Sequence, residues 1–160
     1  MLRPSFHGFI LALGLLGCGS PGPAVLLDGE VTGSFNGTPF TILHGIALKP
    51  TSDNVLGGAI MLSEAELFCG SEDEPIPEGH TALITLNHYG PPSFLTPPTV
   101  QFFQNTGTEG STITIHEGTA QIIAPLDKSL TGTIAVGFTD AEGHLFELNG
   151  FFEVTTCPWD

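Results

Sequence analysis

The sequence predicts an all-β protein: an antiparallel β-sandwich or a flattened barrel of about nine strands, with at most one short helix. Glycine and proline are abundant, at 21 and 13 of 160 residues, and they separate short runs rich in Thr, Val, Ile and Phe. Several of these runs alternate apolar and polar residues, which is typical of antiparallel strands with one solvated face. No stretch shows a long helical period.

The first 17 residues have the anatomy of a secretory signal peptide. Arg3 precedes an apolar run from Phe9 to Leu16, and the small residue Gly17 lies at the expected cleavage site. The run is far shorter than the ~20 residues that span a bilayer, and no later stretch is long enough either. An ordinary cleaved peptide and an uncleaved anchor remain as alternatives.

Leu15-Leu16-Gly17-Cys18 resembles the lipobox of bacterial lipoproteins. The resemblance implies that the Cys18 thiol takes a diacylglyceryl group and that cleavage makes Cys18 the acylated N-terminus. Two or three acyl chains, such as palmitate, hold a protein on a membrane essentially permanently, because each buried methylene contributes about 0.8 kcal/mol. Aspartate after the cysteine is the usual inner-membrane retention signal of such proteins, so Gly19 favours the outer membrane. The expected location is the bacterial cell envelope, with the membrane contacted through the lipid alone.

The rest of the chain divides into two parts. Residues 18–23 form a short lipidated tether of Gly, Ser and Pro. Residues 24–160 are long enough for a single β-domain with one adequate core.

The first hairpin is predicted at Asn36-Gly37, the favoured type I′ pair, between Glu30–Phe35 and Thr38–Leu43. Pairing across a two-residue loop places Gly33 opposite Phe40. The ring would then lie over the gap left by the glycine, which suits a glycine within a strand.

The remaining elements follow from the same patterns. A second hairpin is predicted around Glu117-Gly118, joining Thr112–His116 to Thr119–Ala124. Ser63-x-x-Glu66 has the spacing of a capping box and predicts one helical turn. Further strands are expected near 55–62, 81–88, 99–104, 130–139 and 146–155.

Three cysteines are an odd count, and acylation of Cys18 explains it. Cys69 and Cys157 then remain as one pair in an oxidising compartment, where we expect a disulfide. The crosslink would close a long loop and contribute about 4–5 kcal/mol on the chain-entropy model. Two free buried thiols are the alternative. A metal-binding pair is disfavoured, because neither cysteine has a second cysteine or a histidine close to it in the sequence.

The charge balance excludes nucleic acid as a partner. The chain has 17 acidic residues against three basic ones, of which Arg3 lies in the signal peptide. Phosphate backbones and anionic head groups are repelled by such a surface. The acidity serves solubility or, alternatively, cation binding.

No motif for catalysis is present. The chain lacks a Gly-x-Ser-x-Gly elbow, and Ser34 and Ser111 lie in hairpin settings that explain them. We therefore expect a non-catalytic protein with no catalytic residues and no cofactor.

A metal site is not expected either. The histidines of the mature chain are predicted on the surface or in loops, and no two of them are spaced i, i+2 or i, i+4: His44, His80, His88, His116 and His144. The acidic stretches 71–74 and 140–142 offer oxygen ligands without the spacing of a calcium-binding EF-hand loop.

Two pairs of adjacent phenylalanines, Phe102-Phe103 and Phe151-Phe152, must each point to opposite faces of a strand. Phe151 would lie on an otherwise polar face, where either a second layer covers it or it forms an apolar patch for a partner. A cleft lined by Phe or Trp with Asn and Asp would favour a glycan partner. A flat edge strand with apolar residues would favour a protein.

Three segments of the mature chain carry a resemblance: Gly33-x-Phe35-x-Gly37-x-Pro39-Phe40, Leu130-x-Gly132, and Leu148-x-Gly150-x-Phe152 before the last cysteine. With them the chain resembles the small lipoproteins of unassigned function in bacterial envelopes, and the resemblance implies no known activity. The expected function is that of a lipid-anchored, non-catalytic envelope protein with a structural role or with a protein or glycan partner. The alternative is a small envelope hydrolase or a metal-dependent enzyme.

Overall fold

The computed structural model describes residues 25–50, 57–70, 75–86, 93–95, 99–125 and 128–159. The predicted signal peptide, Cys18 and the tether lie outside these residues, as do His88 and the acidic run 71–74. Within the described ranges, we find no helix with the length and apolar character needed to cross a membrane.

The described chain is all-β, as predicted, and contains no helix. Its strands form one sheet, and their bounds are β1 (Leu26–Phe35), β2 (Thr38–Pro50), β3 (Gly58–Ser63), β4 (Gly79–Leu86), β5 (Ser93–Leu95), β6 (Thr99–Asn105), β7 (Gly110–Ile115), β8 (Gly118–Pro125), β9 (Ser129–Thr139) and β10 (Leu145–Trp159). Neighbours follow the order β5-β8-β9-β10-β1-β2-β3-β4-β6-β7, and each of these pairs is antiparallel. All five strands expected beyond the hairpins are present, as β3, β4, β6, β9 and β10.

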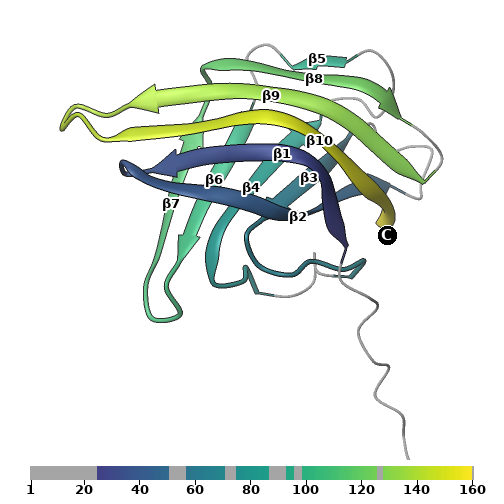
Figure 1. Cartoon of the computed structure of the whole chain (residues 1–160), viewed down its shortest axis with the longest axis horizontal. Coiled ribbons are helices and arrows are strands. Elements are labelled where there is room, and N and C mark those ends of the chain that lie inside the picture. Colours follow the sequence, from purple (N-terminus) through teal and green to yellow (C-terminus); the bar gives the residue numbers. More distant parts are fainter. Residues whose placement is uncertain are drawn as a thin grey trace, which may run out of the picture.

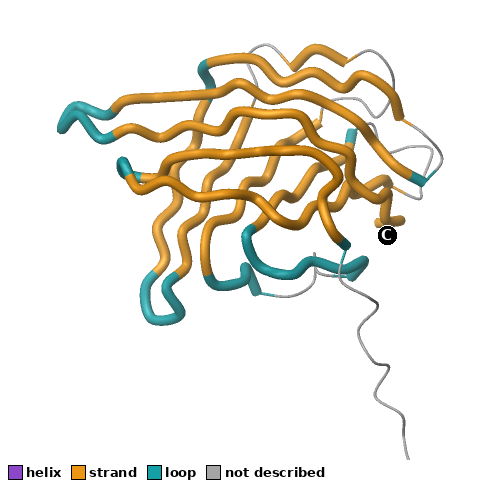
Figure 2. Tube along the Cα trace, in the orientation of Figure 1, coloured by secondary structure: helices purple, strands orange, loops and turns teal. Residues whose placement is uncertain are grey.

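The sheet curls into a half-barrel whose two halves face each other. β8, β9, β10 and β1 cross the front of Figure 1, and β7, β6, β4 and β3 lie behind them. Figure 2 shows the same strands in orange, with the described turns between them in teal. β2 belongs to both halves, because it pairs with β1 through its first part and with β3 through its later part. The end of β2 also pairs in parallel with the end of β10.

The β1–β2 hairpin confirms the predicted register. Gly33 pairs with Phe40, and the turn residues Asn36 and Gly37 have φ values of 53° and 76°. Positive φ at both positions is the signature of the type I′ turn. A Cβ on Gly33 would lie 2.5 Å from the Phe40 ring, so the ring fills the space that the glycine leaves.

The second predicted hairpin is wrong. β7 pairs with β6, where Ile113 faces Phe102, and β8 pairs with β9. The residues around Gly118 form a corner, at which the chain passes from the back half of the sheet to the front half (Figure 1). Gly118 has a φ of 107°, and a Cβ there would collide with the backbone of Ala135, so this glycine permits the close approach of β8 to β9.

The predicted helical turn at Ser63 is also wrong. Ser63 ends β3, and the ladder to β4 continues through a hydrogen bond of 3.1 Å from the Glu64 N–H to the His80 carbonyl. The Ser63 hydroxyl accepts from the Ala65 N–H at 3.1 Å and lies 3.0 Å from the Thr81 hydroxyl. Pairing with β4 holds this backbone extended, so the capping group serves a bend instead of a helix.

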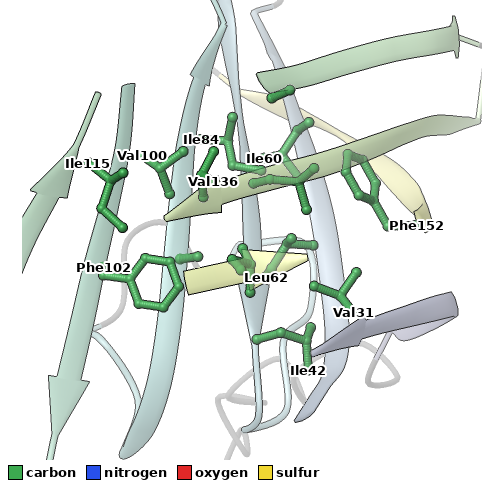
Figure 3. Packing of buried hydrophobic residues seen from close by; sticks show 14 of the residues in the cluster. Val31, Ile42, Ile60, Leu62, Ile84, Val100, Phe102, Ile115, Val136 and Phe152 are labelled. Carbon is green, nitrogen blue, oxygen red and sulfur yellow. The ribbon is translucent and has the colours of Figure 1, made fainter. Parts of the chain in front are cut away.

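The main core fills the space between the two halves of the sheet. Its residues come from both halves, and Figure 3 labels Val31, Ile42, Ile60, Leu62, Ile84, Val100, Phe102, Ile115, Val136 and Phe152. Along β9 these positions alternate with more exposed ones, which is why the apolar–polar alternation predicts them. Strands β2 and β3 instead bury residues on both faces, because a second core covers their other side.

A second, smaller core lies against the β2–β3 part of the sheet and includes the disulfide. Its buried members are Ile46, Leu48, Ala59, Leu67 and Cys157. Cys69 and Cys157 are joined by a disulfide with a Cα–Cα distance of 5.4 Å, which confirms the predicted pairing. The Val25 N–H donates to the Leu67 carbonyl at 2.7 Å. The start of the described chain, the segment after β3 and the end of β10 are therefore fastened together.

Candidate functional site

A groove lies beside β6 and β7, between these strands and the segment that precedes β4. Its volume is about 370 Å³, and its lining consists of Pro75, Ile76, Phe103, Gln104, Asn105, Gly110, Ser111 and Thr112. Small-ligand sites typically span about 300–1,000 Å³, so the groove is large enough for a side chain or a small ligand.

Strand alternation puts an aromatic ring into this groove. Phe102 is fully buried in the main core, whereas Phe103 lies on the opposite face of β6 and is partly exposed. Phe103 faces Thr112 across the strand pair. The sequence therefore predicts that one ring of this pair points outward, although not what surrounds it.

Asn105 fixes the wall of the groove. Its Nδ2 donates to the Ile76 carbonyl at 2.7 Å, and its Oδ1 accepts from the Gly107 N–H at 2.9 Å. The first bond joins the end of β6 to a segment 29 residues earlier in the chain, and the second fixes the side chain to the turn after β6. Together they hold the wall of the groove in place. Sequence reasoning missed Asn105, because no local pattern pairs it with Ile76.

A buried histidine at the start of β4, His80, is paired with a partly exposed carboxylate, Glu64. His80 Nδ1 is 2.7 Å from Glu64 Oε2, which also accepts from the His80 backbone N–H at 2.9 Å. The His80 ring stacks on Phe40 with a centroid distance of 4.5 Å. A carboxylate at this distance pairs with the Nδ1–H tautomer of the ring, since an ionised carboxylate can only accept.

Among the described residues, no hydroxyl or thiol is hydrogen-bonded to the other nitrogen of the His80 ring. His80 Nε2 is buried and, among the described residues, has no hydrogen-bond partner. The nearby Ser63 hydroxyl bonds to Thr81 and to the His80 carbonyl, not to the ring. No nucleophile–base pair is therefore formed here by the described chain.

The surface position predicted for the histidines is wrong for two of them. His44 and His80 are only 8% and 9% exposed. Gly45 faces Val154 and Leu62 of the main core, so the preceding residue, His44, points to the opposite side of β2. There its Nδ1 lies 3.2 Å from the carbonyl of Val25, which packs against the second core. His116 and His144 are exposed, as predicted.

The turn between β9 and β10 brings Asp140, Glu142 and His144 together. One ligand atom of each lies within 4.8 Å of the others, so the three could hold a metal ion. Asp140 accepts from the His144 backbone N–H, and its other oxygen lies 2.8 Å from the His144 ring. These hydrogen bonds account for the arrangement without a metal. The sequence signal for this cluster is the i, i+2, i+4 spacing of two acids and a histidine, which the spacing of the histidines alone does not reveal.

The surroundings of Asp140 shift its acidity. Desolvation raises the pKa of Asp140, but it is outweighed by hydrogen bonds from the backbone and ring of His144, by attraction to that ring and by the Glu142 backbone. The net effect lowers the pKa of Asp140 below its usual value. The carboxylate is thus ionised at neutral pH.

Phe151 is exposed on the outer face of the front half. Its side chain is 45% accessible, and its cross-strand neighbours are Glu30 and Thr133. It stands among polar partners there, as single exposed rings often do.

The chain matches no protein-family model, no curated protein and no solved structure.

Proposed function

We propose that the protein is a lipid-anchored, non-catalytic binding protein of the bacterial cell envelope. The observation that carries the proposal is the motif Leu15-Leu16-Gly17-Cys18 behind a short apolar run, which fits lipid attachment at Cys18. Gly19 favours the outer membrane over the inner. The membrane is then a partner through the lipid alone.

The disulfide supports export from the cytoplasm. Cys69 and Cys157 are bonded to each other, which leaves Cys18 as the one cysteine available for acylation. Disulfides persist mainly in oxidising compartments such as the periplasm and the cell surface. Export and acylation together therefore account for all three cysteines.

The groove supports binding over catalysis. The described residues of its lining offer an aromatic ring, amides and hydroxyls, and none of them carries a carboxylate, imidazole, amine or thiol. Such a surface can hold a ligand by stacking and hydrogen bonds, yet it contains no group that exchanges a proton near neutral pH. The histidine–carboxylate pair, His80 and Glu64, lies elsewhere, with the His80 ring stacked on Phe40.

A metal-dependent enzyme is the second candidate, and the cluster of Asp140, Glu142 and His144 is the observation that favours it. Metal analysis of protein purified without chelator separates the two candidates. A binding protein is expected to contain no stoichiometric metal. Stoichiometric zinc that is lost in an Asp140→Asn variant would favour the enzyme.

The anchor is tested in cells that express the full chain. A Cys18→Ala variant should take up no radiolabelled palmitate and should leave the membrane fraction, whereas the neighbouring Ser20→Ala variant should behave as the unchanged protein does. A Gly19→Asp variant should move from the outer to the inner membrane. Continued membrane association of the Cys18→Ala variant would refute the anchor.

A further inference from the structure

Strand β7 is an open edge of the sheet. The strand order ends at β7, and among the described residues only β6 pairs with it. Ser111, Thr112 and Thr114 are exposed along it. Its outer row of backbone N–H and C=O groups is therefore available to another extended chain.

This edge lacks the usual devices that prevent pairing. β7 contains only Gly, Ser, Thr and Ile, with no proline or charged residue. Its six pairs with β6 run in continuous register, so no bulge twists the edge away. The opposite edge of the sheet, β5, is only three residues long.

The surroundings of β7 suit the side chains of an added strand. Ile113 faces inward and packs only partly buried against the main core. Ser111 and Thr112 line the groove that contains Phe103. The side chains on one face of an added strand would cover Ile113, and those on its other face would lie beside the groove. Pockets along a sheet edge select a peptide by such alternate side chains.

The charge of this region defines the partner. Glu109 immediately precedes β7, and Glu117 follows it closely. Glu78 packs against Gly107, in the turn that leads into β7. The chain has no Lys or Arg between Lys49 and Lys128, and its formal net charge is −14. A second copy of this chain would be repelled, whereas a basic segment would be attracted.

We propose that β7 accepts an extended, basic segment of a partner protein as an added strand, with side chains entering the groove beside Phe103. The inference deepens the proposed binding function by naming the class of partner. It does not depend on the lipid anchor, so failure of either proposal is recognised separately.

The test uses the protein purified from the cells that express it, whether it is found in the membrane or the soluble fraction, and synthetic peptides. The probe is a short peptide of alternating Val and Thr with a Lys at each end. One control peptide carries N-methyl groups on alternate residues and keeps every side chain and charge. A second control replaces both Lys residues with Glu. Binding is measured by fluorescence anisotropy at low and at physiological salt.

Two variants place the same new charge at an edge and in the middle of the sheet. Thr114→Lys adds a cation on β7, and Thr41→Lys adds one at an exposed position of the central strand β2. Thermal unfolding is compared for both. The peptide controls use the unchanged protein, so the test stands even where a variant folds poorly.

We expect the Lys peptide to bind. The affinity of each control peptide should be lower by roughly tenfold or more. The N-methylated peptide loses main-chain hydrogen bonds, and the Glu peptide is repelled by the acidic surface. Thr114→Lys should weaken binding similarly, while Thr41→Lys should not. Equal binding of the N-methylated peptide would overturn strand addition in favour of simple charge attraction. The proposal would also be overturned if the Lys peptide did not bind, or if both variants weakened binding equally. A homodimer that dissociates in the Thr114→Lys variant would overturn it too, because the partner would then be a second copy of the chain.

Discussion

Removal of the disulfide should cost the protein much of its stability. The crosslink joins Cys69 to Cys157 across a sequence separation of 88 residues. On the chain-entropy model, opening a loop of that length lowers the free energy of unfolding by about 4–5 kcal/mol at 25 °C. Natural domains are stable by only about 5–15 kcal/mol, so the loss is a large fraction of the total.

The site of the crosslink also predicts where the loss is felt first. Cys157 is fully buried in the second core, beside Leu67, whose carbonyl accepts the Val25 N–H. Without the disulfide, the segment after β3 is held by the apolar contacts of Leu67 and a few hydrogen bonds. We expect it to open locally before the main core does.

The assay compares the unchanged protein with a Cys69→Ala/Cys157→Ala double variant. Alanine at both positions avoids leaving a buried free thiol. Guanidinium denaturation should show a free energy of unfolding lower by about 4–5 kcal/mol. Hydrogen exchange should show faster exchange at the Val25 N–H, with the amides of β9 and β10 less affected.

Two results would contradict this reasoning. A double variant within about 1 kcal/mol of the unchanged protein would show that the loop is not constrained as calculated. Uniform acceleration of exchange across the whole sheet would show that the second core does not open independently of the main core. A reduced but otherwise unchanged protein serves as the chemical control for the substitutions themselves.

Three further predictions concern single residues. Glu64→Ala leaves two donors of His80 without their acceptor and should lower the free energy of unfolding by about 1–3 kcal/mol, measured by urea denaturation. Gly118→Ala should cost more stability than Gly37→Ala, because both have positive φ but only Gly118 has backbone within contact of a new Cβ; equal melting temperatures would contradict this. Asp140 has a lowered pKa, so its stabilising contribution is present above the unfolded pKa of about 3.9 and is lost as pH falls through the folded pKa. The difference in stability between the unchanged protein and Asp140→Asn should therefore shrink on acidification, and a difference that grows would contradict the sign.

Local signals predicted much of the fold. The Asn36-Gly37 turn sets the register of β1 and β2 within a few residues, so the sequence is sufficient there. Simple alternation likewise predicts β9 and β10, whose inner and outer faces follow a period of two.

The prediction of the second hairpin failed because two strand pairings suited the local sequence equally well. Ile113 finds an apolar partner in Ile122 of a hypothetical hairpin and equally in Phe102 of β6, and the fold uses the second. Only the curl of the whole sheet, which needs Gly118 against β9, distinguishes the two. The groove depends on a similar long-range contact, the hydrogen bond from Asn105 to Ile76, which no short pattern contains.

The proposed anchor and the proposed binding edge lie at different sides of the molecule. Val25, the first described residue after the proposed tether, is bonded to Leu67 beside the second core. That core packs against β2 and β3, whereas β7 ends the strand order on the far side of β4 and β6. Figure 1 shows the start of β1 and strand β7 at different sides of the molecule. A strand added at β7 would therefore extend the sheet away from the tethered end, so a lipid at Cys18 and a protein at β7 need not compete for space.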